Sequence, residues 1–336
     1  MKKLFCLLLL LTLLPVLPAG AETRPLYTAT SKISAPIYAE MDKSSAQVGR
    51  FNAGVSIDVY AIYPEWLEIG TGKGRGYIPR TYLFAGKAVD KESTPPWGVV
   101  FYQYVGLTGA AGADILTAPA AGSPSLIHLD PGTQVSVMEL ENGWAKLVYY
   151  RQYGYIDTNL LSELLPVCAD PASATSRAPI ATFTSYYVTD SDDEGVSGKE
   201  INIGVNCADM NGLVLEAGEY MDYDVRFGPY GPLKNYVKGP VLLDSGWGLG
   251  PGGGVCQVSS TLYNVLLQLP GINIIHAQPH GASGVAYLPV DMDAAVGNAS
   301  HSVDMMFRND YDFSIRVEAL AQHGALFIAI YRVTEQ

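Results

Sequence analysis

A cysteine directly after a run of glycines is the feature of this sequence best suited to chemistry. Gly252-Gly253-Gly254 precedes Cys256, and apolar residues recur at helical spacing from Val255 to Leu269. At about 100° per residue, Cys256 falls off this apolar stripe. A helix N-terminus stabilises a thiolate, and glycines leave backbone N–H groups free for an oxyanion. The pattern indicates either a nucleophilic cysteine or an inert thiol on a buried helix.

Further blocks extend this pattern towards the carboxy terminus. Residues 252–264 read Gly-Gly-Gly-Val-Cys-Gln-Val-Ser-Ser-Thr-Leu-Tyr-Asn, and they are followed by Pro279-His280, Tyr287-Leu288-Pro289, Asp293-Ala294-Ala295-Val296 and residues 304–309. In this order the blocks resemble the VanW family, over roughly residues 180–320. The resemblance implies a cell-wall enzyme that carries out L,D-transpeptidation of peptidoglycan through a cysteine nucleophile.

Acyl transfer by a cysteine also needs a base and a group that orients it. His280 is the best base candidate, because it occupies the family's Pro-His block, and His276 is the second choice. A carboxylate would fix the tautomer of the histidine and stabilise its cation. Asp293 is the first choice for this carboxylate and Asp304 the second. Each of these residues, taken alone, could equally be structural.

The oxyanion donors and the remaining polar residues are predicted from position. Gly253, Gly254 and the amide of Cys256 precede or begin the helix, and so they are the candidate oxyanion donors. Ser260 and Tyr263 share the helix face of the cysteine and contact either substrate or core. No Cys-x-x-Cys pair or His/Cys cluster has zinc spacing, so we expect no metal and no cofactor.

The expected reaction joins the third residues of two peptidoglycan stem peptides. The Cys256 thiolate attacks the amide before the terminal D-alanine, D-alanine leaves, and a side-chain amine of a second stem resolves the thioester. With water as acceptor the same site is an L,D-carboxypeptidase. Two further hypotheses are a thiol protease and a non-catalytic peptidoglycan-binding or adaptor protein, in which Cys256 is merely buried.

The amino terminus predicts export. Residues 1–21 combine Lys2 and Lys3, a short apolar run and the small residues Ala19-Gly20-Ala21, which is typical of a cleaved signal peptide. We therefore expect an extracytoplasmic protein, in the cell wall or secreted, without stable membrane insertion after cleavage. An uncleaved signal that acts as an anchor is the alternative.

Charge and cysteine content restrict the partners further. Without Lys2 and Lys3 the formal charge changes from −12 to −14, which disfavours nucleic acid and anionic membranes as partners. Cys168, Cys207 and Cys256 remain, so at least one thiol is free unless chains cross-link. A Cys168–Cys207 disulfide is possible. Oligomeric state is left open.

Residues 26–165 contain an internal repeat. Ala35-Pro36 matches Ala118-Pro119, while Gly54, Trp66 and Gly76-Tyr77-Ile78 match Gly132, Trp144 and Gly154-Tyr155-Ile156 at an offset of 78 residues. Short alternating runs between Gly and Pro turns predict two small all-β barrels, at residues 26–90 and 99–165. The motif order resembles bacterial Src-homology-3-like domains, which implies wall binding or a spacer role. Residues 90–96 join the repeats.

A linker at residues 166–179 leads to the predicted catalytic domain at residues 180–336. Asp190 to Glu194 is interpreted as a solvated loop, and Asn211-Gly212 as a hairpin turn. Four carboxylates are interpreted as turn and surface residues: Glu216, Glu219, Asp222 and Asp224. Strands are expected at residues 284–288, 303–307, 314–319 and 325–331. The result is a multidomain prediction: two barrels and an α+β domain with a central, cysteine-bearing helix against a sheet.

Overall fold

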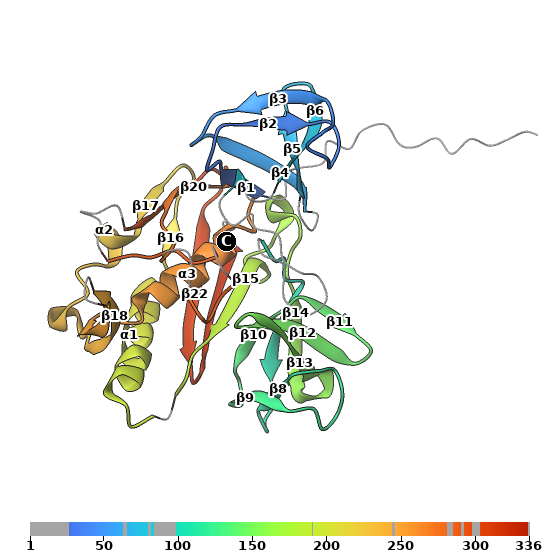
Figure 1. The fold of residues 1–336 in the computed structure, drawn as a ribbon. Helices are drawn as coiled ribbons and strands as arrows, with labels where there is room; N and C mark the ends of the chain where they lie inside the picture. The colour runs from blue at the N-terminus through green and yellow to red at the C-terminus, as the bar shows by residue number, and fades with distance from the viewer. Residues whose placement is uncertain are drawn as a thin grey trace, which may run out of the picture.

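The computed structural model describes residues 27–62, 66–79, 82–83, 99–189, 191–243, 246–280, 285–289, 292–297 and 303–334. The predicted signal peptide and the join at residues 90–96 lie outside the described residues. Figure 1 shows a blue amino-terminal unit, a green second unit and a yellow-to-red carboxy-terminal domain. Within the described residues, no helix combines the length and the apolar character that crossing a membrane requires.

The first unit is an antiparallel sheet of short strands: β1 (Tyr27–Thr30), β2 (Ala35–Tyr38), β3 (Gln47–Phe51), β4 (Ser56–Ile62), β5 (Trp66–Thr71) and β6 (Gly74–Pro79). The strand order is β1-β4-β5-β6-β2-β3. A barrel closes only when its edge strands pair with each other. Among the described residues nothing pairs β1 with β3, and β3 is largely exposed, so the sheet is open and the predicted closed barrel is wrong here.

The second unit repeats this arrangement with two more strands: β7 (Tyr104–Thr108), β8 (Ala113–Leu116), β9 (Ser125–Leu129), β10 (Gln134–Val137), β11 (Glu139–Glu141), β12 (Trp144–Tyr149), β13 (Gln152–Asp157), a 3₁₀ turn η2 (Thr158–Leu160) and β14 (Leu161–Pro166). A bend at Met138 carries the chain from the sheet β10-β7-β14 into the sheet β11-β12-β13-β8-β9. Because the strands divide between two open sheets, the barrel prediction is corrected here as well.

The strands of the two units recur at the offset of 78 residues. The first residues of β2, β3, β4, β5 and β6 are followed at this distance by those of β8, β9, β10, β12 and β13. Ala35, which begins β2, therefore corresponds to Ala113, which begins β8. Ala118 lies beyond β8, so the predicted match of Ala35 with Ala118 is wrong. The second Ala-Pro dipeptide follows the first at 83 residues, which differs from the offset of the strands.

The carboxy-terminal domain combines antiparallel sheets with helices: β15 (Pro179–Tyr186), α1 (Glu194–Met210), β16 (Val214–Leu215), β17 (Tyr220–Asp222), α2 (Tyr223–Phe227), η4 (Pro232–Lys234), β18 (Lys238–Leu243), β19 (Gly246–Pro251), α3 (Val255–Leu266), β20 (Ile272–Ala277), β21 (Met305–Asn309), β22 (Ile315–Gln322) and β23 (Ala325–Arg332). Its sheets run β15-β23-β22-β16, β17-β21-β20 and β18-β19. A 3₁₀ turn η3 (Pro171–Ser173) lies in the predicted linker. The described chain is thus mostly β, with three α-helices.

In several places the local structure of this domain differs from the one predicted. Residues 285–288 form a turn rather than a strand. Asp193 caps α1, with its carboxylate accepting from the amides of Gly195 and Val196, so the predicted loop ends in a helix. Asn211 ends that helix, and Gly212 follows with φ +83°, so this pair is a helix C-terminus and not a hairpin turn.

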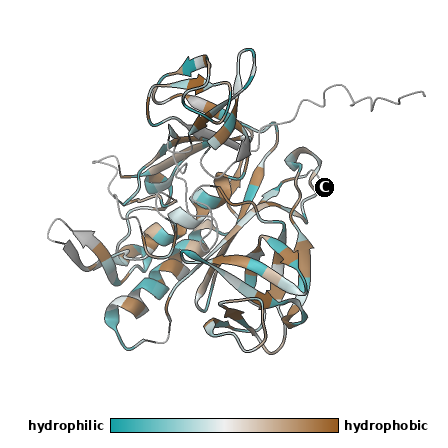
Figure 2. Cartoon of the chain, turned by 45° about the vertical axis from the view of Figure 1, so that its right-hand side comes forward, coloured by the Kyte–Doolittle hydropathy of each residue, from teal (hydrophilic) through white to brown (hydrophobic). Residues whose placement is uncertain are grey.

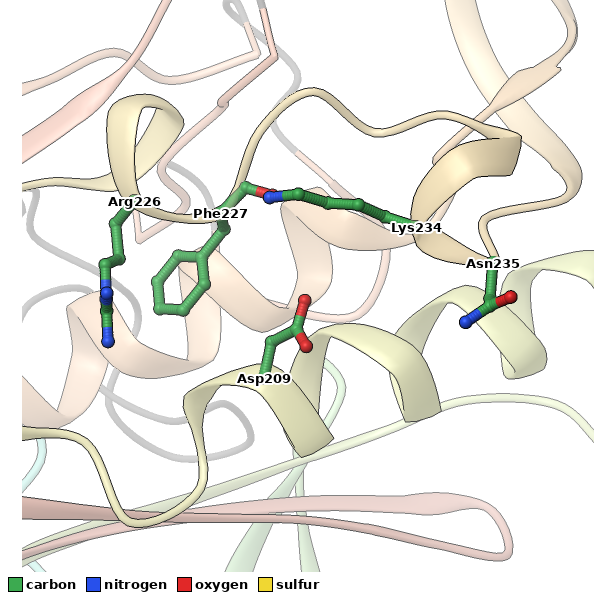
Figure 3. A pocket seen from close by; sticks show the side chains of 5 residues that line it. All are labelled: Asp209, Arg226, Phe227, Lys234 and Asn235. Atoms are coloured by element: carbon green, nitrogen blue, oxygen red, sulfur yellow. The ribbon is translucent and has the colours of Figure 1, made fainter.

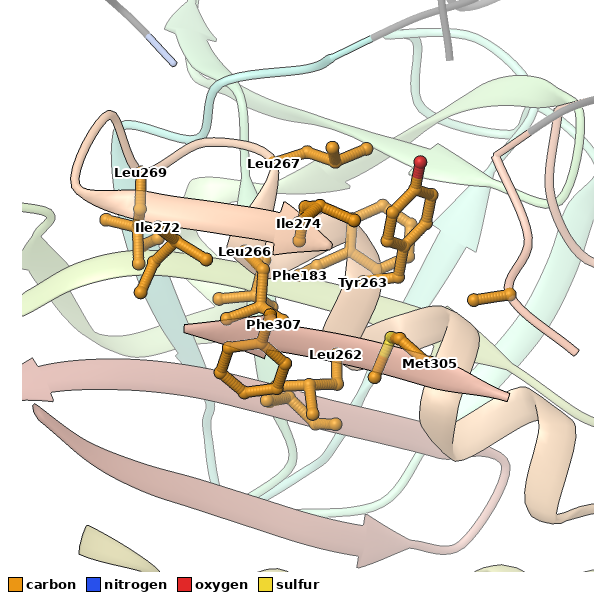
Figure 4. Packing of buried hydrophobic residues seen from close by; sticks show 14 of the residues in the cluster. Phe183, Leu262, Tyr263, Leu266, Leu267, Leu269, Ile272, Ile274, Met305 and Phe307 are labelled. Atoms are coloured by element: carbon orange, nitrogen blue, oxygen red, sulfur yellow. The ribbon is translucent and has the colours of Figure 1, made fainter. Parts of the chain in front are cut away.

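One apolar core runs from the first unit into the carboxy-terminal domain. Val59 and Leu67 of the first unit belong to the same cluster of buried side chains as Leu262 of α3 and Phe307 of β21. Figure 4 shows the α3 part of this cluster, with Leu262 and Leu266 facing β20 and β21. Apolar residues also run along many strands of the molecule (Figure 2). The first unit is therefore packed onto the domain.

The second unit is joined to the domain by hydrogen bonds, of which those between Ser136 and β15 are buried. The amide of Ser136 donates to the hydroxyl of Thr184 on β15 at 2.9 Å. On β22, which β23 separates from β15, the side chain of Gln322 accepts from the amide of Gln134 at 2.9 Å and donates to the carbonyl of Gly132 at 3.0 Å. Buried polar contacts of this kind require a defined relative orientation of the two parts.

Candidate active site

A glycine turn sets the start of α3. Gly252 and Gly254 have φ values of +77° and +113°, which favour glycine. A Cβ atom on Gly253 would lie 2.2 Å from the carbonyl carbon of Gly239 on β18, so this turn lies flat against the β18–β19 hairpin. The second residue of α3, Cys256, is thereby held at the edge of the hairpin.

Cys256 lies at the margin of the apolar core, packed against it but only partly buried. Its neighbours Val255 and Gln257 are buried, whereas Cys256 is partly exposed. The Sγ atom donates to the carbonyl of Val296 at 3.4 Å. The side chain of Gln257 donates to the carbonyl of Tyr186 at 2.9 Å, which ties the first turn of α3 to β15. The first turn of α3 is therefore fixed on the side that faces β15, and Cys256 stays partly exposed.

His280 and Asp293 form a tight pair beside this thiol. One carboxylate oxygen, Oδ2 of Asp293, lies 2.7 Å from Nδ1 of His280 and accepts from the His280 amide at 2.7 Å. The Asp293 side chain is completely buried and that of His280 is 15% exposed. Burial lowers the pKa of His280, but the interactions with Asp293 and Cys256 outweigh it and raise the pKa to about 10. The imidazole therefore carries a proton at neutral pH.

Polar residues of α3 hold the segment that carries Asp293. The hydroxyl of Ser260 accepts from the amide of Ala294 at 3.0 Å. One turn later, the side chain of Asn264 donates to the carbonyl of Met292 at 2.7 Å. Both anchors flank Asp293, so α3 positions the carboxylate as well as the cysteine. Ser260 is completely buried and Tyr263 is 2% exposed, which assigns both to packing rather than to substrate contact.

A second set of contacts holds the end of this segment. The amide of Gly297 donates to both carboxylate oxygens of Asp224 at 2.9 Å, and the hydroxyl of Tyr230 donates to Oδ1 of Asp224 at 2.6 Å. Gly297 directly follows Val296, whose carbonyl accepts from Cys256. The interpretation of Asp224 as a surface residue is therefore wrong, because its carboxylate positions the site from α2.

The backbone donors near Cys256 differ in availability. The Gly253 amide donates to the carbonyl of Gly250 at 3.3 Å. Within the described part of the chain, the amides of Gly254 and Cys256 donate no hydrogen bond. Both groups lie at the positive end of the α3 dipole. They are therefore better placed than the Gly253 amide to donate hydrogen bonds to an oxyanion.

The second-choice residues belong to other surroundings. Oδ1 of Asp304 accepts from the amides of Asp224 and Met305 at 3.1 and 2.7 Å. Burial raises the pKa of Asp304 to about 6, with a further contribution from a hydrogen bond to Asp222. His276 lies on β20, opposite Met306 of β21. The structure thus brings together Cys256, His280 and Asp293, and it places Asp304 in a separate acidic group.

Two cations near the site were not singled out by the sequence. Lys199 of α1 has its ammonium 5.0 Å from the ring centroid of Tyr287. Arg151, in the β12–β13 hairpin of the second unit, donates to the carbonyls of Val285 and Leu288 at 2.8 and 2.9 Å. The Tyr287 block of the family resemblance was the one signal that pointed towards this region.

Two other cysteines, Cys168 and Cys207, lie in the described part of the chain. Cys168 and Cys207 are free thiols, so the possible disulfide between them is not formed. Cys207 is buried on α1, and burial raises its pKa. In the described ranges, no group of three or more His, Cys, Asp or Glu side chains is arranged to hold a metal ion.

A cavity of about 360 Å³ lies away from these residues. It is lined by Asp209, Arg226, Phe227, Lys234 and Asn235, and Figure 3 shows these side chains between α1, α2 and η4. The ammonium of Lys234 is already bound to the carbonyls of Phe227 and Gly228, at 2.8 and 2.6 Å. Cys256, His280 and Asp293 do not line this cavity. The candidate active site is therefore assigned from its reactive side chains and not from the cavity.

Comparison with known families assigns the part of the chain that holds this cluster. The family model described as VanW like protein matches residues 198–331. Residues 198–331 are a VanW-like domain. Cys256, His280 and Asp293 all lie in the VanW-like domain, as does Lys199, whereas Arg151 does not. The resemblance of the two amino-terminal units to Src-homology-3-like domains is not shown and stays a prediction.

Individual relatives add little. An uncharacterized protein of Bacillus subtilis (strain 168), YoaR, is 30% identical over 179 residues, which are 53% of this chain and 52% of that protein. The chain thus spans about half the length of this curated relative. An NlpC/P60 family protein from Bacillus cereus ATCC 10987 aligns at 11% identity over 45% of this chain and 60% of its own, with a TM-score of 0.17. NlpC2 from Trichomonas vaginalis aligns at 9% identity over 94% of this chain and 100% of its own, with a TM-score of 0.18. With TM-scores this low, these two solved structures support no statement about this chain.

Proposed function

We propose that this protein is an exported cell-wall enzyme, a cysteine-dependent L,D-transpeptidase that acts on peptidoglycan stem peptides. The observation that carries the proposal is the cluster of Cys256, at the N-terminus of α3, with His280 bound to buried Asp293. A cationic imidazole beside a thiol favours the thiolate, which is the nucleophile in acyl transfer. The VanW-like domain, with its expected role in the cell wall, supports the choice of substrate.

The first half-reaction forms a thioester. Sγ of Cys256 attacks the carbonyl carbon between the third stem residue and D-alanine, and the resulting oxyanion is held by the amides of Gly254 and Cys256. As the C–N bond breaks, His280 gives its proton to the departing nitrogen, so D-alanine leaves as a neutral amine. Asp293 holds the ring throughout, with Nδ1 facing its carboxylate.

The second half-reaction resolves the thioester. The side-chain amine of another stem attacks the same carbon, its proton passes to His280, and the C–S bond breaks to release the Cys256 thiolate. The product is a cross-link between two third residues. If water attacks instead, the product is a free tripeptide, as expected of a carboxypeptidase.

The test uses the purified mature chain and its Cys256→Ala variant with disaccharide-tetrapeptide fragments. We expect the native chain to form a cross-linked dimer with loss of D-alanine, as read by mass spectrometry, and the variant to form none. Tripeptide without dimer would assign hydrolysis to the same cysteine. No mass change with either folded protein would favour the non-catalytic wall-binding or adaptor function.

A further inference from the structure

Lys199 reaches across the start of α3. A Cβ atom on Gly254 would lie 2.9 Å from Cγ of Lys199 and 2.9 Å from its carbonyl oxygen, so the lysine stem packs directly on the glycine turn. From there its ammonium extends to 5.0 Å from the ring centroid of Tyr287. Lys199 thus spans the distance between the α3 N-terminus and the Tyr287 segment.

Tyr287 connects this cation with the nucleophile. Burial raises the pKa of Tyr287, and the charge on Cys256 raises it further. Lys199, Gly254, Cys256, His280 and Tyr287 are all partly exposed. By contrast, Asp293 behind them is buried. Lys199 and the reacting groups Cys256 and His280 are thus all partly open to solvent.

No carboxylate of the described chain neutralises this ammonium. Burial alone lowers the pKa of Lys199 to about 8, without a compensating acid. The two acids of the site are engaged elsewhere: Asp293 binds His280, and Asp224 binds Gly297 and Tyr230. A half-buried amine without a counter-ion lowers stability, and such costs are retained where they serve binding or catalysis.

We propose that Lys199 binds the terminal carboxylate of the acyl donor, an inference that rests on the proposed function. The D-alanine carboxylate belongs to the residue directly after the scissile amide, so it must lie within about 4 Å, one Cα spacing, of the reacting residue. Lys199 packs on Gly254, two residues before the nucleophile. From this turn the side chain carries its ammonium towards Tyr287, and an ammonium binds a carboxylate through a charge-assisted hydrogen bond. The subsite therefore selects stems that end in a free carboxylate.

The experiment compares two donors that differ in one group: a tetrapeptide stem ending in D-alanine and the same stem ending in D-alaninamide. Tripeptide and cross-linked product are quantified for the native chain and for Lys199→Met and Lys199→Arg. Lys43→Met is the matched control, because Lys43 also lies over a tyrosine ring, 5.9 Å from Tyr82, but belongs to the first unit. Unfolding temperatures verify that each variant is folded.

We expect the native chain to prefer the carboxylate donor by about 10- to 100-fold in kcat/KM, the range of a hydrogen bond to a charged group. Lys199→Met should lose this preference mainly through KM, Lys199→Arg should keep part of it, and Lys43→Met should keep all of it. Equal use of both donors by the native chain, or an unchanged preference in Lys199→Met, overturns the inference alone. No product from either donor means that the proposed function itself has failed, and the subsite with it.

Discussion

At the scale of single residues, the pairing of His280 with Asp293 determines where protons are held. Because Oδ2 of Asp293 contacts both the amide and Nδ1 of His280, the ring orientation and the protonated nitrogen are set together. Nε2 remains as the nitrogen that can exchange a proton with substrate. The buried carboxylate stabilises the imidazolium and explains why its pKa rises in spite of burial.

This pair predicts a pH-dependent stability. The pKa of His280 rises from 6.5 in the unfolded chain to about 10 in the folded protein. The stabilisation is complete below pH 6.5 and is lost as the pH rises through 10, since the folded state binds the extra proton only in that window. We expect the unfolding temperature of the native chain to fall more steeply across this range than that of His280→Gln. Parallel curves for the two proteins would contradict the assignment.

At the scale of elements, the glycines of α1 show how closely this helix approaches the β18–β19 hairpin. A Cβ atom on Gly198 would lie 1.8 Å from the carbonyl oxygen of Lys238, whereas one on Gly204 would meet nothing within 4 Å. Asn202 lies between them and donates to the carbonyls of Val237 and Gly253, at 3.0 and 2.8 Å. The approach of α1 therefore supports the glycine turn that begins α3.

These two glycines give a matched pair of substitutions on one helix. Gly204→Ala should raise the free energy of unfolding by about 0.5–1 kcal/mol, because alanine is the better helix former at an open position. Gly198→Ala should lower it by about 1–3 kcal/mol or more, because α1 must move away from β18. Urea unfolding of both variants measures the difference. A stabilised Gly198→Ala would show that the helix does not make this contact.

At the scale of the whole molecule, the second unit is part of the site's support. Arg151 contacts the carbonyls on both sides of Tyr287 from a hairpin that is 134 and 137 residues away in sequence. The unit itself is fixed to β15 through Ser136 and Thr184. Besides the wall-binding or spacer role predicted from the repeat, the unit thus holds the Tyr287 segment through Arg151.

Arg151→Ala should therefore lower activity without unfolding the protein. We expect kcat/KM for the tetrapeptide donor to fall about 10- to 100-fold, since small displacements beside reacting groups are costly, and Arg151→Lys to recover part of it. The matched control is Lys73→Ala, because Lys73 is exposed and precedes Arg151 by the repeat offset of 78 residues. Equal activity of Arg151→Ala and Lys73→Ala would remove Arg151 from the site.

Much of the local chemistry was readable from the sequence. The glycine turn, the helix with its off-stripe cysteine and the spacing of the repeat are local or periodic patterns, and such patterns survive without knowledge of contacts. Helix α1 was missed because Gly198, Asn202 and Asn206 share its buried face with the apolar side chains, so its apolar stripe is short and interrupted. Barrel closure was overpredicted, because alternation indicates strands but does not determine which edges pair.

What the sequence by itself determined is the set of reactive groups and the repeated β units; what only the tertiary structure decided is which of them meet. Asp293 was preferred over Asp304 on a block resemblance, but their separate roles follow from packing of α3 against residues 292–296. Lys199 and Arg151 join the site through contacts between residues far apart in the chain. Composition and periodicity carry no information about such contacts, because they depend on how whole elements pack.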